Sequence, residues 1–289
     1  MCPAYHNSTW GDEETHCSNF HTDLDYQNRH GDEWWTPEDK MLDSITTGKQ
    51  PKPRRQMIYG PHGVGKSTFA SKAEGAIFIQ TEDGLGDIDC ARFPLCKTLK
   101  DVQGNIRALF VEDHEYKTVV IDSLDWLERL VWADICASEG KSDIAEIGYG
   151  KGYSMALGHW TKILYSLAML REEKGMATVL IAHTKIEKFE DPSGDSYDRY
   201  SPRLHKLVSG VVQEWCDEVL FATYRIFTKK SGEGFRERTV GIGTGERVLY
   251  TTDRPAHIAK NRLGLPDEVP LEWPVQAAPV VKETKKEKK

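Results

Sequence analysis

The sequence lacks the features that mark membrane and secreted proteins. No apolar run approaches the ~20 residues that a membrane-spanning helix needs, and the N-terminus has neither the basic segment nor the apolar stretch of a secretory signal. The six cysteines are scattered without the spacing of a disulfide framework, which a chain this long does not need. We therefore expect a soluble, cytoplasmic protein with reduced thiols and no membrane partner.

An excess of positive charge is also missing. The formal net charge is -7 at pH 7, which argues against a uniformly basic surface that coats nucleic acid, so any DNA contact must come from local basic loops. The chain has 289 residues, of which 39% are hydrophobic, and it can bury one sizeable core. We expect one main domain.

The chain does have a phosphate-binding motif. The stretch Met57 to Thr68 reads MIYGPHGVGKST and matches G-x-x-x-x-G-K-[ST] directly after a short apolar strand. The backbone N–H groups of such a loop surround a polyphosphate, and the following helix adds the positive end of its dipole. We expect Lys66 to contact the β and γ phosphates and Ser67 to bind Mg²⁺. The predicted nucleotide-binding residues are Gly60, Pro61, His62, Gly63, Val64, Gly65, Lys66, Ser67 and Thr68.

Polar side chains follow three apolar strands, at the strand ends where open α/β sheets bind ligands. Glu82 follows the strand 76–80, and its carboxylate could activate water. Within the run 116–124, the apolar strand ends in Asp122. Asp122 is the expected acidic partner of the phosphate loop and would hold Mg²⁺ directly or through water. Its alternative role is to cap a helix. His183 follows the strand 177–182 and could sense the γ-phosphate, or be satisfied by backbone groups alone.

Apolar periodicity predicts the remaining elements. Helical patterns cover residues 101–112, 126–137, 153–170 and 204–214, with a mobile Gly-rich loop at 146–152. Later strands are expected at 219–227, 235–240 and 247–251, with a turn at 243–246.

The polar segment from Lys185 to Pro202 is a candidate DNA contact, with a solvated loop as the alternative. Its basic side chains could bind phosphates, and its tyrosines could stack on bases. With the basic residues just beyond it, the candidates are Lys185, Lys188, Arg199, Arg203 and Lys206.

The main domain is expected to cover residues 41–273. Residues 1–40 show little apolar periodicity and are expected to form a poorly ordered extension, and residues 274–289 a disordered charged tail. Two C-x3-H pairs in the extension could supply a tetrahedral zinc site, although their spacing fits no common zinc finger. These candidate zinc ligands are Cys2, His6, Cys17 and His21.

Taken in order, the motifs GPHGVGKST, FIQTEDGL, VVIDSLDW, VLIAHTK and HIAKNRLGLP resemble the RecA-like ATPases of phages and prophages, the group that includes RecA-type single-strand annealing proteins. The resemblance implies an α/β RecA-like P-loop fold with a mostly parallel central sheet flanked by helices, plus an antiparallel extension at the C-terminal side. It also implies hydrolysis of ATP with Mg²⁺, in which Glu82 polarises the attacking water and Asp122 is the Mg²⁺-associated acid. His183 stands where this family carries a Gln.

The same resemblance implies partners. Lys260 and Arg262 match a K-x-K or K-x-R pair that reaches into a neighbouring subunit's nucleotide, which implies a homo-oligomer, ring or filament, whose isolated protomers are poor ATPases. The segments after Glu146 and after His183 correspond in order to DNA-binding loops, which implies single-stranded DNA as a ligand that stimulates ATPase activity. A single-strand binding protein is a further candidate partner, and a phage-encoded chain would act in the host cytoplasm.

Two other functions fit the motifs less well. One is a replication helicase-like motor or loader, although no N-terminal collar domain is visible. The other is a nucleotide-dependent regulator or phosphotransferase that does not bind DNA, although no compact Arg-rich lid is visible. Stimulation of ATP turnover by single-stranded DNA separates the regulator from the other two, and strand displacement identifies the motor.

Overall fold

The computed structural model describes residues 41–192, 194–231 and 238–273. These residues belong to two units that divide between Pro51 and Lys52, and the short helix η1 (Met41–Ser44) lies in the first unit. The predicted zinc ligands Cys2, His6, Cys17 and His21 lie outside the described residues, as do the tail 274–289 and the rest of the extension 1–40. The zinc site and the limits of the main domain therefore stay predictions.

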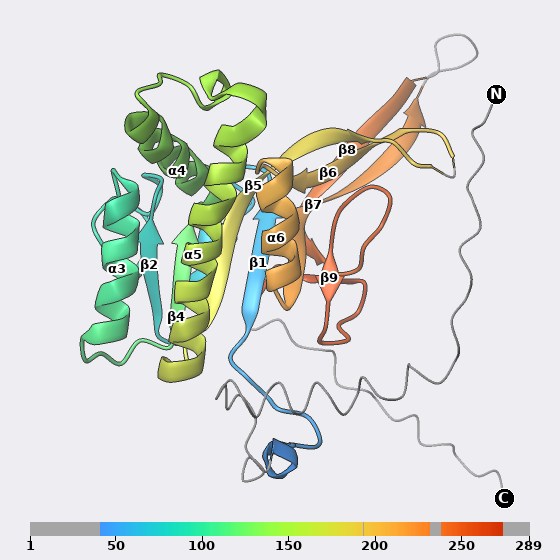
Figure 1. Ribbon diagram of the computed structural model, residues 1–289. Coiled ribbons are helices and arrows are strands. Elements are labelled where there is room, and N and C mark those ends of the chain that lie inside the picture. The colour runs from blue at the N-terminus through green and yellow to red at the C-terminus, as the bar shows by residue number, and fades with distance from the viewer. Residues whose placement is uncertain (1–40, 193, 232–237, 274–289) are drawn as a thin grey trace, which may run out of the picture. The chain divides into compact units, whose positions relative to one another are not determined.

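The second unit is built on a sheet whose strands are drawn from residues 55 to 270 (Figure 1). The strands are β1 (Arg55–Gly60), β2 (Ala76–Gln80), β3 (Ala91–Arg92), β4 (Thr118–Asp122), β5 (Ala177–Phe189), β6 (Tyr197–Pro202), β7 (Glu218–Ser231), β8 (Arg238–Tyr250), β9 (Lys260–Asn261) and β10 (Glu268–Pro270).

The strand order in the described residues is β10-β8-β7-β1-β5-β4-β2-β3, with β6 paired to β5 and β9 paired to β7. The six strands from β7 to β3 are parallel. By contrast, β6, β8, β9 and β10 each pair antiparallel with their neighbour. The predicted α/β class, a mostly parallel sheet with an antiparallel extension at the C-terminal side, is therefore confirmed.

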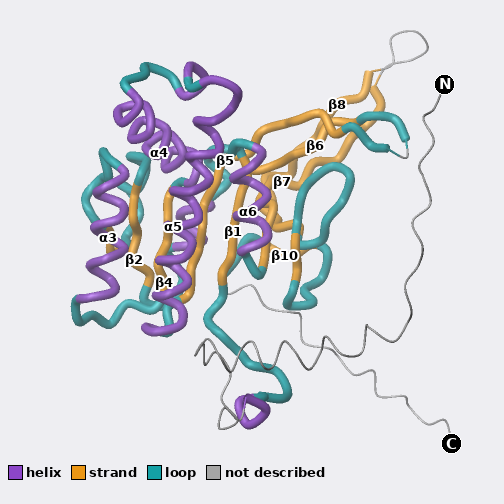
Figure 2. The backbone as a smooth tube through the Cα atoms, in the orientation of Figure 1, coloured by secondary structure: helices purple, strands orange, loops and turns teal. Residues whose placement is uncertain are grey.

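Helices cover the sheet, as the tube view shows (Figure 2). They are α2 (Lys66–Ala70), α3 (Leu99–Val111), α4 (Leu124–Glu139), α5 (Lys151–Lys174) and α6 (Lys206–Trp215), with short 3-10 turns η2 (Ile144–Glu146) and η3 (Gly148–Gly150) in the Gly-rich segment. Local sequence sets where α3 begins, because Thr98 and Asp101 form a capping box that satisfies free backbone N–H groups. Its buried face then follows at helical spacing, with Val102, Ile106 and Leu109.

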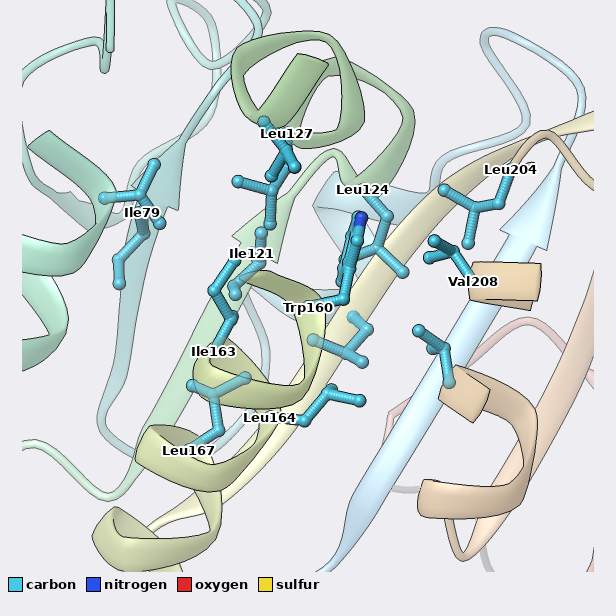
Figure 3. Packing of buried hydrophobic residues seen from close by; sticks show 14 of the residues in the cluster. Ile79, Ile121, Leu124, Leu127, Trp160, Ile163, Leu164, Leu167, Leu204 and Val208 are labelled. Carbon is cyan, nitrogen blue, oxygen red and sulfur yellow. The ribbon is translucent and has the colours of Figure 1, made fainter. Parts of the chain in front are cut away.

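Alternation along each strand divides the core into two layers. Met57 and Tyr59 of β1 point to one face, where α3, α4, α5 and α6 pack, and Ile58 points to the other, where α2 packs. Figure 3 shows the first layer, in which Trp160 of α5 lies beside Ile121 and Leu124. Trp160 is 1% exposed, so this large side chain anchors α5 to the sheet.

Two sequence predictions differ from the structure. The strand after Met176 does not end at Ala182 but continues to Phe189, and the polar segment after it returns as β6, pairing Ile186 with Tyr200. The turn predicted at 243–246 is wrong as a break between two strands, because β8 runs through these residues. Gly243 pairs with Ile226 and Arg247 with Tyr224, and a register shift lies between the two pairs. In both cases, cross-strand hydrogen bonds outweigh the local preference of polar residues and glycine for turns.

The strand register gathers the predicted catalytic residues at one edge of the sheet. Gly60 of β1 lies opposite His183 of β5, and Asp122 of β4 lies opposite Gln80, two residues before Glu82. Because these strands are parallel, their carboxyl ends meet at the same edge. Within the described residues, no helix is long and apolar enough to cross a membrane.

Candidate active site

The phosphate loop is fixed between the core and β7. Val64 is fully buried, and the Tyr224 hydroxyl of β7 donates a hydrogen bond to the Gly63 carbonyl at 3.1 Å. A Cβ at Gly60 would lie 2.1 Å from the Ala222 carbonyl oxygen, so only glycine fits where β1 meets β7. Gly65 has φ 104°, which glycine adopts without strain. The loop is thus pre-formed before α2 begins at Lys66.

Lys66 is a buried cation at the floor of this loop. Its Nζ donates to the carbonyl oxygens of Gly60 at 3.0 Å and Pro61 at 2.9 Å. Burial lowers the pKa of Lys66 to about 8, although the nearby Asp122 carboxylate opposes this shift. A buried ammonium group is stabilised by a neighbouring anion, so this position suits a phosphate group.

Ser67 and Asp122 place two oxygen atoms beside the loop. The Ser67 hydroxyl donates to Oδ2 of Asp122 at 2.6 Å. Burial raises the pKa of Asp122, and the hydrogen bond from Ser67 opposes that rise. Within the described residues, no three His, Cys, Asp or Glu side chains gather closely enough to form a metal site by themselves. Mg²⁺ commonly takes one or two protein oxygens and completes its shell from phosphates and water, so this pair fits it.

Glu82 lies on the neighbouring strand end and is held by a second set of hydrogen bonds. The Ser123 hydroxyl donates to Oε2 of Glu82 at 3.1 Å. Ser123 is itself bound through its backbone, which accepts from the Thr81 hydroxyl at 2.7 Å and donates to it at 2.9 Å. The Glu82 side chain is 28% exposed, so the carboxylate is oriented but still reachable by water.

His183 is hydrogen-bonded to Asp125, a residue that the sequence analysis did not select. Its backbone N and its Nδ1 lie 3.1 Å and 3.0 Å from Oδ1 of Asp125, and the Arg203 guanidinium donates to Oδ2 of Asp125 at 3.0 Å. The ring of His62 in the phosphate loop packs against the His183 ring at a tilt of 32°, with ring centroids 4.0 Å apart. The signal for Asp125 was present in VVIDSLDW, where a second acid follows Asp122 by three residues at the start of the next helix.

The phosphate loop, the carboxylates of Glu82 and Asp122 and the two histidines line one cavity of about 380 Å³, a size that suits a small ligand. Arg247 of β8 also lines it, and its Nη1 lies 2.9 Å from the position that a Cβ on Gly65 would take. No sequence motif singled out Arg247. The cavity is lined by His62, Gly63, Gly65, Lys66, Ser67, Thr68, Glu82, Gly84, Ile88, Asp122, His183 and Arg247.

The predicted trans-acting pair lies at the opposite edge of the sheet. Lys260 in β9 pairs with Val219 near the start of β7, and its ammonium donates to the carbonyl oxygens at the end of α6. Arg262 forms an ion pair with Asp217 at 3.3 Å and keeps 56% of its side chain exposed. Both are thus remote from the phosphate loop of their own chain, and their role toward a neighbouring subunit stays a prediction.

The candidate DNA-contacting residues lie on β5, on β6, in the segment between β6 and α6, and at the start of α6. Lys185 is paired with Glu187, Arg199 with Asp253 and Arg203 with Asp125. The side chains of Lys188 and Lys206 are exposed. Three of the five candidates therefore already have acidic partners, and their contact with DNA stays a prediction.

Comparison with known proteins agrees with this geometry. A family model described as an AAA domain matches residues 52–263, which is most of the chain and includes every residue of the cavity. The chain belongs to the AAA domain family. Proteins of this family are generally ATPases, as the phosphate loop of this AAA domain predicts.

The other comparisons add less. No curated protein matches the sequence of this AAA domain. The crystal structure of the RadB recombinase matches with a TM-score of 0.38 and 15% identity, over 73% of this chain and 86% of that chain. That likeness adds nothing to the assignment of function.

The arrangement of this AAA domain suits phosphoryl transfer to water. A buried cation, a pair of oxygens for a divalent ion and an oriented carboxylate line the same cavity. Phosphoryl transfer depends on positioning and electrostatic stabilisation more than on covalent chemistry, and these groups supply both.

Proposed function

We propose that this protein binds ATP with Mg²⁺ and hydrolyses the ATP to ADP and phosphate. The observation that carries this proposal is the meeting of Lys66, Ser67, Asp122 and Glu82 in one cavity. Each residue meets a different requirement of the reaction: a cation for the phosphates, two oxygens for Mg²⁺ and a carboxylate for the water. A motif that only shaped the chain would not need all four side chains in one cavity.

Each residue then has a role. Lys66 binds the β and γ phosphates, and Ser67 with Asp122 would hold the metal. Mg²⁺, when bound, offsets the negative charge of the phosphates. Glu82 orients a water molecule and accepts its proton as the water oxygen bonds to the γ-phosphorus. The bond from the γ-phosphorus to the bridging oxygen breaks, and ADP leaves. His183 and Lys66 meet the charge that develops on the γ-phosphoryl oxygens.

We further propose that the protein acts on single-stranded DNA, in recombination or annealing of the phage type. The support is the sequence resemblance and the path of the chain, because β5 runs directly from His183 into the hairpin that carries Lys185 and Lys188. A change at His183 on hydrolysis can therefore reach that hairpin through one continuous strand. A homo-oligomer in which Arg262 reaches the neighbouring nucleotide, a single-strand binding protein as partner, and action in the host cytoplasm belong to the same proposal.

The test is ATP hydrolysis by the purified protein with and without single-stranded DNA, across a salt series, with Lys66→Ala as the blank. We expect hydrolysis that DNA stimulates, and stimulation that falls as salt rises, because phosphate contacts release counterions. Hydrolysis that ignores DNA would refute the DNA part and favour a nucleotide-dependent regulator. DNA-stimulated hydrolysis coupled to strand displacement would favour the helicase-like motor instead.

A further inference from the structure

We infer that Asp125 is a positioning residue for His183, and that Arg203 holds Asp125 in place for this task. The inference rests on the proposed ATPase function, because His183 faces the cavity where the γ-phosphate would bind. Asp125 itself lines no part of that cavity, so its effect on the reaction passes through His183.

The geometry is a three-residue clamp. Asp125 stands in the first turn of α4 and is 5% exposed. Both of its carboxylate oxygens lie 3.0 Å from Nδ1 of His183, and Oδ1 also accepts the His183 backbone N–H at 3.1 Å. Arg203 closes the clamp, since its guanidinium donates to Oδ2 of Asp125 at 3.0 Å and its backbone N–H to the His183 carbonyl at 2.8 Å.

The clamp determines which ring nitrogen of His183 is held by Asp125 and which one can face the nucleotide. Burial alone would raise the pKa of Asp125, but hydrogen bonds from His183 and the charge of Arg203 outweigh it and hold that pKa well below its usual range. The carboxylate can only accept hydrogen bonds, so it keeps a proton on Nδ1 of His183. Nε2 is then the ring nitrogen left to meet a ligand, and it donates to a phosphate oxygen when it carries a second proton. A Gln at this position would need no such partner, because its amide has a fixed donor and a fixed acceptor and no tautomers.

A structural role for Asp125 is the alternative, because an acid in the first turn of a helix is favoured by the helix dipole. The hydrogen bonds of Asp125 argue against this alternative. In the described residues, the hydrogen bonds to the Asp125 carboxylate come from His183 and Arg203, and none comes from a backbone N–H of α4.

The first experiment is a double-mutant cycle on turnover. Asp125→Asn keeps the size of the side chain but removes its charge, and we expect kcat to fall about 10- to 100-fold with little change in ATP affinity. In a His183→Gln background the same substitution should change kcat less than about twofold, because the imidazole ring that Asp125 positions is absent. Asp134→Asn, farther along α4, is the matched control and should behave as wild type. Equal losses in both backgrounds, or no loss in the wild-type background, would overturn the inference.

A second measurement does not depend on turnover. Histidine ¹⁵N spectra of the full chain report which ring nitrogen carries the proton, and His183→Gln assigns the signal. We expect protonated Nδ1 in the wild type and a changed pattern in Asp125→Asn, with unfolding curves confirming that the variant is folded. If wild-type protein fails to hydrolyse ATP but shows this change, the proposed function fails and the positioning role stands. An unchanged pattern would remove the positioning role whatever the activity.

Discussion

At the scale of single residues, a substitution at Glu82 should separate ATP binding from ATP hydrolysis. Its carboxylate is held by Ser123 and lines the cavity, but it forms no hydrogen bond with Lys66 or Ser67. We expect Glu82→Gln to bind ATP with near wild-type affinity while kcat falls about 100-fold or more, because the amide cannot accept the proton of water. Nucleotide titration and steady-state hydrolysis measure the two effects separately.

The matched control for this prediction is the neighbouring acid. Asp83 is exposed and lies outside the cavity, so Asp83→Asn should leave both affinity and turnover unchanged. A Glu82→Gln variant that turns over ATP at the wild-type rate would show that another group activates the water.

Arg247 makes a different residue-scale prediction. It approaches the loop from the β7–β8 side of the sheet, whereas Glu82 and Asp122 lie on the other side of β1. Its guanidinium should therefore serve the part of the nucleotide that ATP and ADP share. We expect Arg247→Ala to weaken binding of both roughly tenfold, as loss of one charge-assisted contact would.

The control for Arg247 is Arg254→Ala, since Arg254 is an exposed residue that pairs with Asp267 away from the cavity. Calorimetric titration with ATP and with ADP gives the comparison. A loss confined to ATP would place Arg247 at the γ-phosphate, and unchanged affinity for both nucleotides would remove it from the site.

At the scale of elements, Lys260 secures the end of α6. Its ammonium donates to the carbonyl oxygens of Gln213, Glu214 and Cys216 at 2.9, 2.9 and 2.6 Å, groups that a helix end leaves without partners. We expect Lys260→Met to lower the free energy of unfolding by about 1.5–3 kcal/mol, the range for hydrogen bonds to charged groups. Urea unfolding of the isolated variant measures this loss.

Lys206→Met is the control, because Lys206 is an exposed residue at the other end of α6. It should unfold like the wild type. If Lys260→Met is as stable as the wild type but loses turnover, the bonds within the chain matter little, and the predicted contact with a neighbouring nucleotide gains support.

At the scale of the whole molecule, Arg262 tests whether the active site is shared between protomers. Its side chain is 56% exposed at the sheet edge opposite the phosphate loop, so it cannot serve the nucleotide of its own chain. We expect Arg262→Ala to lose most turnover as a pure protein. Mixing it with Lys66→Ala should restore part of that turnover, because each variant supplies the group that the other lacks.

A mixture of Arg262→Ala with the double variant Lys66→Ala/Arg262→Ala is the control and should stay inactive. Size-exclusion chromatography of each mixture confirms that subunits exchange. Wild-type turnover by Arg262→Ala alone, or no recovery in an exchanging mixture, would show that each protomer works without its neighbour.

The sequence by itself determined the features that depend on neighbours in the chain. The phosphate loop is continuous from Gly60 to Ser67, and its glycines and Lys66 act through their own backbone and the helix that follows. Glu82, Asp122 and His183 could be selected because each follows an apolar run. Parallel strands bring such ends to one edge whatever their order in the sheet, so the shared cavity followed from local patterns.

Only the tertiary structure decided which distant residues complete the site. Asp125, Arg203 and Arg247 reach it from α4, from the segment before α6 and from β8, and their contacts depend on which strands pair. The same reason explains the strand predictions that were wrong. Pairing with β6 extends β5, and pairing with β7 on either side of residues 244–246 keeps that stretch within β8, although the composition of both segments favours turns. Local periodicity specifies a helix or strand, but the strands that pair in the folded chain decide how long a strand is and which side chains reach the site.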